Sequence, residues 1–388
     1  MYRYSPSCLP NSRIDVADVL RGIAIGGIVL IHFVEHMNFY MFPEPSATDT
    51  AVWNTVFFLL AGKMYAIFAL LFGLSLYIQH DNQAQRGVDF RPRFVWRMVL
   101  LMGFGLIDLC FYNGDILFLY AVCGLLVLPL VRLSSRVLRW VAAVLLLQPV
   151  ELVYMILGLF DESMRPLSLG SGAHFAAIMP AQIDGSIVDV AVAGIEHGLP
   201  CNFLWAIEHG RMTQTLLLFV MGILIGRRRL FYDEGYNLRT WRTILFASVA
   251  AFALVYPLSE RLPGLIDNVC VAHSAGVMLT MWRNLAMMFI IVSGVVLLFY
   301  LTRARRALMV IAPYGKMSLT NYIGQSVIGG MIFYGWGFGL YRYSGHTTSL
   351  LLGVVVVLLQ WAFCRWWLSH HKRGVLEQLW HRATWIGR

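Results

Sequence analysis

Long runs of apolar residues without charge constrain this chain more than any other feature. A helix needs about 20 apolar residues to cross the hydrocarbon core of a bilayer. Residues 349–368, which contain LLLGVVVVLLQWAF, form the strongest such run. The runs are continuous and do not alternate apolar with polar residues, which favours helices over a β-barrel. The ten candidate segments are 20–40, 53–79, 95–112, 115–131, 137–160, 208–226, 243–258, 285–301, 317–336 and 349–368.

These runs predict an all-α polytopic membrane protein with about ten transmembrane helices. Hydrophobic residues make up 59% and charged residues 13% of the 388 positions, against about 45–50% and 25% in an ordinary soluble domain. This composition rules out disorder, and it argues against a water-soluble enzyme, because a soluble fold lacks the polar surface to cover so much apolar material. The six cysteines include no C-x-x-C pair, and we expect no cleaved signal peptide.

Basic residues are distributed unevenly between the segments that connect the runs. With the N-terminus in the cytoplasm, the cytoplasmic segments hold 24 of the 30 Lys and Arg residues. This asymmetry follows the positive-inside rule and predicts that both termini are cytoplasmic. It also accounts for the net charge of +9 without nucleic acid, so we expect membrane lipids as partners instead. The external basic residues are Arg165, Arg211, Arg261, Arg283 and Arg342.

The expected topology divides the chain into three parts. Residues 1–160 form an N-terminal half of five helices, residues 161–210 an external loop, and residues 211–388 a C-terminal half of five helices. The loop combines acidic residues with short apolar runs, which is typical of amphipathic helices on a membrane surface. Cys201 and Cys270 both fall on the external side. A disulfide between them requires Cα atoms within about 7 Å of each other, and the sequence leaves that pairing open.

The first run carries the most polar side chains. Asp18 and Arg21 lie three residues apart on one helical face, and we expect them to pair with each other or with a ligand. His32 follows eleven residues later, about 16 Å deeper in the bilayer. Glu35 and His36 share its face. A histidine beside a carboxylate has the parts of a general base, whereas the plainer interpretation is a hydrogen bond that packs two helices together.

Two observations bear on the role of His32. Ionisable residues inside a membrane are expensive and usually functional, which favours the general base. The stretch from His32 to His36 also matches the H-x-x-E-H pattern of inverted zinc proteases. Two histidines four residues apart can chelate zinc, but the sequence offers no third ligand, so we expect no metal.

Four more polar positions fall within the runs or at their ends. Lys63 interrupts the second run, where it either snorkels toward the interface or binds substrate. Asp115 follows an Asn-Gly turn and either caps the next helix or takes part in the site. Asn321 and Gln325 share a helical face and either hydrogen-bond a neighbouring helix or bind substrate.

Several motifs together resemble one family of bacterial membrane proteins. The second half contains YGKMSLTNYIGQSVI from Tyr314, followed by FYGWGFGL from Phe333. The first half contains DVLRG from Asp18, FALLFGLS from Phe68 and NGDILFLYA from Asn113. Over almost the whole chain, this pattern resembles the YeiB-like proteins, whose C-terminal half is a domain of unknown function.

The resemblance implies an activity. YeiB-like proteins are related to transmembrane acyltransferases, among them the O-antigen and peptidoglycan acetylases and the lysosomal heparan glucosaminide acetyltransferase. Those enzymes pass an acyl group from cytoplasmic acyl-coenzyme A to a glycan across the membrane. In the acetylases a Leu-Arg-Gly motif opens the first helix and a histidine further along it is catalytic. Arg21-Gly22 and His32 match these places. YeiB-like members often carry Asn where His32 stands, so this chain is closer to an active acyltransferase than the family average.

We therefore expect a membrane acyltransferase of the bacterial inner membrane. Its co-substrate is acetyl-coenzyme A or another acyl-coenzyme A, and its acceptor is an external glycan or lipid-linked hydroxyl or amine. The rival classes are a transporter or flippase, which also suits many spans around a midplane polar site, and a scaffold or sensor without turnover. The sequence specifies neither acyl group nor acceptor, and it leaves a homodimer open. The expected catalytic residues are His32, Glu35 and Asp115; the expected cofactor-binding residues are Arg21, Arg93, Arg97 and Lys316; and the expected substrate-binding residues are His36, Lys63, Asn321 and Gln325.

Overall fold

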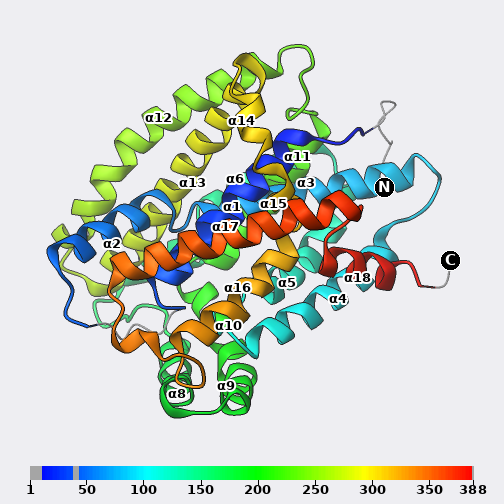
Figure 1. The fold of residues 1–388 in the computed structure, drawn as a ribbon. Helices are drawn as coiled ribbons and strands as arrows, with labels where there is room; N and C mark the ends of the chain where they lie inside the picture. Colours follow the sequence, from blue (N-terminus) through cyan, green and yellow to red (C-terminus); the bar gives the residue numbers. More distant parts are fainter. Residues whose placement is uncertain (1–10, 38–42, 387–388) are drawn as a thin grey trace.

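The computed structural model describes residues 11–37 and 43–386 and contains no strand in those two ranges. Its helices pack into one bundle (Figure 1). The helices are α1 (Asp15–Val34), α2 (Ala47–Leu59), α3 (Met64–Ala84), α4 (Arg91–Leu109), α5 (Leu117–Val127), α6 (Ser135–Leu146), α7 (Pro149–Phe160), α8 (Ser171–Asp184), α9 (Ile187–Ala193), α10 (Leu199–Glu208), α11 (Arg211–Arg227), α12 (Asn237–Arg261), α13 (Val269–Leu301), α14 (Arg305–Met309), α15 (Ala312–Lys316), α16 (Ser318–Phe333), α17 (His346–His370) and α18 (Val375–Thr384). Positions 38–40 of the first expected segment lie outside the described residues.

The protein is an all-helical, multi-pass membrane protein. In the described part of the chain, six helical stretches are long and apolar enough to cross a membrane, and one bent pair makes a seventh. The expected count of ten spans and the cytoplasmic termini stay predictions. The six stretches are Asp15–Val34, Ala47–Ala84, Ile187–Glu208, Asn237–Leu265, Val269–Leu301 and His346–His370, and the bent pair is Ser135–Leu146 with Pro149–Phe160.

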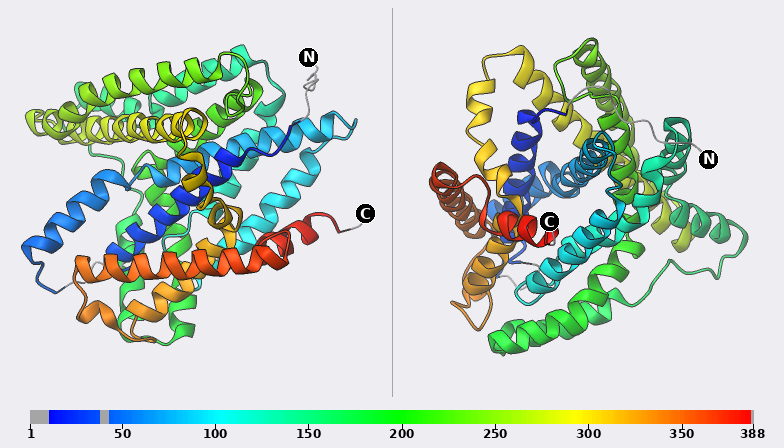
Figure 2. Two further views of the ribbon diagram at one scale, coloured as in Figure 1. Left: turned by 45° about the horizontal axis from the view of Figure 1, so that its top comes forward. Right: turned by 90° about the vertical axis from the view of Figure 1, so that its right-hand side faces the viewer.

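Helix α1 lies at the centre of the bundle, in contact with α3, α15, α16 and α17 (Figure 2). Two glycines allow its close approach to α15. A Cβ atom on Gly315 would lie 1.9 Å from the carbonyl oxygen of Asp18, and one on Gly22 would lie 2.6 Å from the side chain of Ile311. Small residues let helix backbones pack closely where water is absent. The YGK and DVLRG motifs, far apart in the sequence, therefore meet in space.

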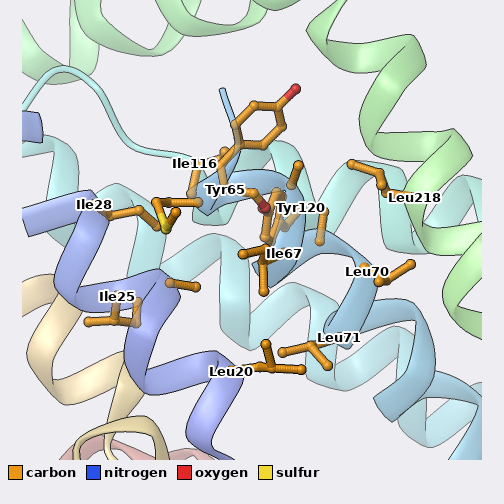
Figure 3. Close-up of a cluster of buried hydrophobic side chains, with 14 of the residues drawn as sticks. Leu20, Ile25, Ile28, Tyr65, Ile67, Leu70, Leu71, Ile116, Tyr120 and Leu218 are labelled. Carbon is orange, nitrogen blue, oxygen red and sulfur yellow. The ribbon is translucent and has the colours of Figure 1, made fainter. Parts of the chain in front are cut away.

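The buried core beside α1 is formed by α3, α5 and α11. Helices α3 and α11 also pack backbone to backbone, because a Cβ on Gly73 or on Gly222 would lie 2.2 Å from a carbonyl oxygen of the other helix. The apolar side chains between these helices are buried and interlock (Figure 3). The residues labelled there are Leu20, Ile25, Ile28, Tyr65, Ile67, Leu70, Leu71, Ile116, Tyr120 and Leu218.

Two expected spans are interrupted. The segment 53–79 is divided between α2 and α3, and Gly62 in the break adopts a left-handed φ of 77°. The segment 137–160 is bent by 46° between α6 and α7. Gln148 is left-handed there and Pro149 starts α7, because proline fits a first helical turn but not a helix interior.

The expected external loop is largely helical. Helices α8, α9 and α10 occupy most of it, and α9 continues through a π-helical turn, Gly194–Gly198, into α10. The stretch Ile187–Glu208 is also long and apolar enough to cross a membrane. Cys201 and Cys270 are both free thiols, and the sulfur of Cys270 instead contacts the carbonyl oxygens of Tyr154 and Arg165. The disulfide that the sequence left open does not form.

The short helix α18 returns to the bundle beside α4 and α16. Its Glu377 carboxylate accepts hydrogen bonds from the backbone N–H groups of Leu319 and Thr320 and from the Thr320 hydroxyl. It thereby satisfies N–H groups in the first turn of α16. Burial raises the pKa of Glu377 above its usual value, and these hydrogen bonds oppose that rise. The anchored α18 places Trp380 against Arg97 of α4, with the guanidinium 4.1 Å from the ring centroid.

The contact between α1 and α15 gives a stability prediction. Gly315→Ala forces a methyl group against the Asp18 carbonyl, and we expect a loss of about 1–3 kcal/mol from overpacking. Gly103→Ala in α4 is the control, because no atom lies within 4 Å of its added Cβ. It should leave stability unchanged or raise it by up to about 1 kcal/mol. Unfolding of both variants in mixed micelles measures the difference, and equal stabilities would contradict the close packing.

The charge asymmetry gives a topology prediction. Ser163 and Val88 are both exposed, and they lie in segments that we expect outside and inside the cell. In intact cells, a membrane-impermeant thiol reagent should label Ser163→Cys and not Val88→Cys, and the order should reverse in inverted vesicles. The unsubstituted protein gives the background from its own cysteines. Labelling of both positions from the same side would contradict the expected topology.

Candidate functional site

Two cavities follow one another along α1. The first, of about 600 Å³, lies at the C-terminal part of the helix and contains His32; we call it the histidine cavity. The second, of about 320 Å³, lies nearer the start of the helix and contains Arg21; we call it the arginine cavity. Both are lined by Ile28, Ile116 and Tyr322. These three side chains therefore form a common wall between the cavities.

His32 lines the histidine cavity and contacts the second half of the chain. Its Nδ1 lies 3.0 Å from Nε2 of Gln325 on α16. Its ring packs against Tyr112, with 4.7 Å between ring centroids, and lies edge-on to Tyr322 at 6.4 Å. The amide and the two aromatic rings hold the imidazole from several sides. Since Nδ1 is engaged by Gln325, Nε2 is the nitrogen left for a ligand.

The orientation of the Gln325 side-chain amide determines which ring nitrogen of His32 carries the proton. With Nε2 of the amide facing the ring, Nδ1 accepts and the proton of a neutral imidazole sits on the other nitrogen. With the amide turned by half a turn, Oε1 accepts the Nδ1 proton and leaves Nε2 of His32 as a base. Among the described residues, Oε1 of Gln325 is buried without a hydrogen-bond partner. The site therefore contains an amide that can stabilise either tautomer.

Two carboxyl groups share the histidine cavity with His32. Glu35 follows the last residue of α1 as its C-cap and lines the cavity. Asp115 lines it from the loop before α5, and its two oxygens accept the backbone N–H groups of Leu117 and Phe118 at 2.9 and 2.8 Å. Asp115 therefore both caps the start of α5 and faces the cavity, so the two alternatives left open by the sequence coexist.

Cations gather around the arginine cavity. Arg21 donates to Asp18 at 3.1 Å and to the hydroxyl of Ser75 at 2.6 Å, which fixes its guanidinium at the cavity wall. Arg97 and Lys316 also line the cavity. Within the described residues, Nε of Arg97 is buried without a hydrogen-bond partner. Burying a hydrogen-bond donor without an acceptor costs free energy. An anionic ligand in the cavity would supply the missing acceptor.

Five of the expected site residues line neither of these two cavities. Gln325 reaches the site through its contact with His32, and the other four lie elsewhere. Arg93 donates to the Thr384 carbonyl at 2.6 Å and faces α18. His36 adopts a φ of 48° after α1 ends at Val34, and its ring faces Ser349 Oγ at 2.7 Å. It therefore does not share the cavity-facing side of His32, contrary to the expected helical spacing. Asn321 bonds Tyr314 and Cys364 within the bundle, and Lys63 lines a third cavity.

The H-x-x-E-H pattern does not assemble a metal centre. His36 is turned toward Ser349 and stacks on Phe333, so His32 and His36 cannot chelate one ion as helical neighbours. No group of three His, Cys, Asp or Glu side chains able to hold a metal occurs between residues 11 and 37 or between 43 and 386. The role of His32 as a general base stays a prediction, beside the alternative of a hydrogen bond that packs two helices together.

Several residues of the site carried no signal strong enough to be selected from the sequence. Tyr322 is buried in the wall between the cavities, and its hydroxyl accepts the N–H of Ile116 at 3.1 Å. Ser75 holds Arg21 from α3. Arg211 lines the histidine cavity, although the sequence only counted it among the external basic residues. The motif that begins at Phe68 contains Ser75, and the motif that begins at Tyr314 contains Tyr322. A sequence motif does not show which of its residues face α1.

Known families match both halves of the chain. Residues 225–387 match the model described as a protein of unknown function (DUF418), and residues 13–160 match heparan-alpha-glucosaminide N-acetyltransferase, catalytic. The uncharacterized protein YeiB of Escherichia coli (strain K12) is 28% identical over 383 residues, which cover 95% of each chain. The chain is therefore similar to the YeiB-like proteins over almost its whole length. The match of its first half links this YeiB-like protein to transmembrane acyltransferases.

Other relatives of the YeiB-like protein extend over its full length. The uncharacterized protein YxaH of Bacillus subtilis (strain 168) is 26% identical, covering 97% of this chain and 96% of its own. An uncharacterized 39.9 kDa protein in the amylase 3′ region of Bacillus acidopullulyticus is 24% identical, covering 96% and 94%. The acetyltransferase match contains Arg21, His32, Arg97 and Asp115, whereas Lys316 and Gln325 fall in the match of unknown function.

Proposed function

We propose that this YeiB-like protein is a membrane acyltransferase that moves an acyl group from acyl-coenzyme A to a hydroxyl or amine acceptor. The observation that carries the proposal is the pair of cavities along α1, one rich in cations and one containing a histidine, with Ile28, Ile116 and Tyr322 lining both. A donor bound in one cavity and an acceptor bound in the other would meet at this wall.

Acyl-coenzyme A suits the arginine cavity. Its phosphates require cations, which Arg21, Arg97 and Lys316 supply. The rest of the cavity wall is largely apolar, with Phe68 and Phe72 among its residues, and about 320 Å³ suits a thin pantetheine arm better than the whole coenzyme. Acetyl-coenzyme A or another acyl-coenzyme A therefore serves as co-substrate, and the positive-inside rule puts this cavity on the cytoplasmic side of the bacterial inner membrane.

His32 then acts as the general base. Its Nε2 takes the proton from the acceptor hydroxyl or amine while the acceptor atom attacks the thioester carbonyl carbon. As the tetrahedral intermediate collapses, the C–S bond breaks, and the proton passes from the imidazolium to the leaving thiolate. The products are the acylated acceptor and coenzyme A, so atoms and charge balance. Gln325, with its oxygen turned toward Nδ1, holds the required tautomer.

The other expected residues have supporting roles in this proposal. Glu35 and Asp115 share the histidine cavity and stabilise positive charge that develops on the His32 ring. His36 and Asn321 pack helices together, as their buried hydrogen bonds to Ser349 and Tyr314 indicate. The acceptor lies outside the cell, is glycan or lipid-linked, and enters through the histidine cavity. No nucleic acid takes part.

The stacked cavities also suit a transporter or flippase. A thin wall between two cavities at a midplane polar site resembles an alternating-access arrangement, and the break between α2 and α3 supplies non-helical backbone beside the histidine cavity. Such a protein moves its substrate without cleaving a thioester. The two classes therefore differ in one measurable product, free coenzyme A.

The test of the acyltransferase is His32→Ala. In membrane vesicles supplied with labelled acetyl-coenzyme A, the unsubstituted protein should release coenzyme A and transfer label to membrane-bound products. Loss of a general base typically lowers the rate by about 10²–10⁴-fold. The exposed His370 of α17 supplies the control, and His370→Ala should keep the full rate. Undiminished turnover in folded His32→Ala, or no coenzyme A release by either protein, would contradict the proposal.

The cofactor contacts give a second test, which compares an arginine that lines the arginine cavity with an arginine that lies outside it. Arg21→Lys loses the planar fork that spans Asp18 and Ser75. We expect KM for acetyl-coenzyme A to rise about tenfold or more, since a hydrogen bond to a charged group contributes about 1.5–3 kcal/mol. Arg93→Lys is the control, because Arg93 faces α18 outside the cavity. Equal effects of both changes on KM would contradict binding at the arginine cavity.

A further inference from the structure

A third cavity opens beside the histidine cavity. It has a volume of about 1030 Å³, is lined by α2, α10, α12 and α13, and contains Lys63; we call it the lysine cavity. Phe57, Gly62, Trp205 and Arg211 line both this cavity and the histidine cavity. A molecule in the lysine cavity therefore borders directly on the space that contains His32.

Two cations without carboxylate partners face the lysine cavity. Lys63 is only 3% exposed, and its Nζ donates to the Phe57 carbonyl at 3.3 Å. The Arg211 guanidinium lies over the rings of Tyr65 and Trp205, 4.0 and 4.7 Å from their centroids, and its Nε is buried without a hydrogen bond among the described residues. Neither side chain forms an ion pair with a described carboxylate.

The backbone adds to this positive charge. Lys63 is the N-cap of α3, and Arg211 is the first residue of α11. The N-terminus of a helix carries a partial positive charge and favours anions. Lysine and arginine are therefore the unfavourable residue types at these two positions unless a negative group binds there. Lys63 at the start of α3 and Arg211 at the start of α11 both line the same cavity.

The remaining charges on the cavity wall do not cancel these two cations. Arg283 is already paired with Glu260, and Asp267 is exposed. Oδ1 of Asn284, which packs against Gly62, is buried without a hydrogen-bond partner in the part of the chain that the structure describes. Burying a charge is costly unless it is paired. The cavity therefore has a surplus of positive charge that an anionic ligand would neutralise.

The apolar walls of the lysine cavity indicate what kind of molecule the anionic group belongs to. Phe58 of α2 packs edge-on against Phe252 and Tyr256 of α12, and all three line the cavity. Helix α12 lies along one edge of the molecule (Figure 2), and none of its most apolar 18-residue window is buried inside the protein. The cavity is thus bounded by an apolar helix that faces the bilayer. An aromatic, bilayer-facing wall beside buried cations suits a ligand with an apolar chain and an anionic head.

We propose that the lysine cavity binds the phosphate-bearing headgroup of a membrane lipid, with Lys63 and Arg211 as its anion ligands, and that this lipid is the acyl acceptor or carries it. The binding claim stands on the charges and the cavity. The acceptor claim rests on the proposed function, because it needs His32 to act on a group that reaches from the lysine cavity into the histidine cavity.

If Lys63 has only a structural role, its replacement should change the stability of the protein in the opposite direction. If Lys63 only caps the break between α2 and α3 through its bond to Phe57, its removal destabilises the protein. If it is a cation kept for an anionic ligand, Lys63→Met replaces an unpaired buried charge by an apolar side chain of similar length. That change should raise the melting temperature in the absence of anionic lipid and abolish the anion effect.

The experiment compares full-length proteins in nanodiscs of pure phosphatidylcholine and in nanodiscs with a minor fraction of phosphatidylglycerol, without acyl-coenzyme A. A ligand that binds only the folded state raises the melting temperature. We expect phosphatidylglycerol to raise it in the unsubstituted protein and in the exposed-site control Lys372→Met. The increment should be lost in Lys63→Met and in Arg211→Gln. Inorganic phosphate added to phosphatidylcholine nanodiscs should have no effect at the same concentration.

Two results would overturn the proposal. Equal increments in Lys63→Met and Lys372→Met would show that phosphatidylglycerol acts on the surface charge of the protein and not in the cavity. An equal, Lys63-dependent increment from inorganic phosphate would show a site for a free anion instead of a lipid headgroup. Both readouts measure binding without acyl transfer, so they are independent of the His32→Ala result. Failure of the acyltransferase proposal would leave the lipid site to be judged on its own data.

Discussion

The close packing of α1 against α15 is the contact on which the rest of the structure depends. A bilayer offers no water to unpaired polar groups, so polar side chains of a membrane helix must find partners inside the protein. Gly22 and Gly315 bring the two backbones close enough for the N-terminal part of α1 to lie inside the bundle. Arg21 then meets Ser75, and His32 meets Gln325. The contact thus holds α1 inside the bundle, where Arg21 and His32 find partners on α3 and α16.

The charges divide the interior into regions of different chemistry. The arginine cavity has cations held by hydrogen bonds, the histidine cavity combines an imidazole with two carboxyl groups, and the lysine cavity has cations at two helix N-termini. The histidine cavity shares lining residues with each of the other two cavities and therefore lies between them. In the proposed acyl transfer, the acyl donor, the reacting groups and the acceptor must lie next to one another in the same spatial order. The proposed function and the proposed lipid site are therefore two consequences of one arrangement.

The site is assembled from both halves of the chain. Arg21, His32 and Asp115 come from the half that matches an acetyltransferase, while Gln325 and Tyr322 come from the half that matches a family of unknown function. The second half thus orients the imidazole and completes the wall between the cavities. This gives the YeiB-like second half a physical role in the site. The expected division of the chain at residues 160 and 210 stays a prediction.

The sequence by itself determined the helical membrane class, the family resemblance and the importance of α1, because hydropathy, charge asymmetry and motif spacing are local properties of the chain. It also selected Arg21, Arg97, His32 and Asp115, whose residue types are expensive in a membrane. Only the tertiary structure separated Arg97 from Arg93, which lie four residues apart on α4, because only the fold shows that Arg97 lines the arginine cavity while Arg93 donates to the Thr384 carbonyl. It also turned His36 away from His32, because helical spacing ends where α1 ends. The surplus of positive charge at Lys63 and Arg211 could not be predicted from the sequence either. Whether a cation has a carboxylate partner depends on which residues the fold brings near it.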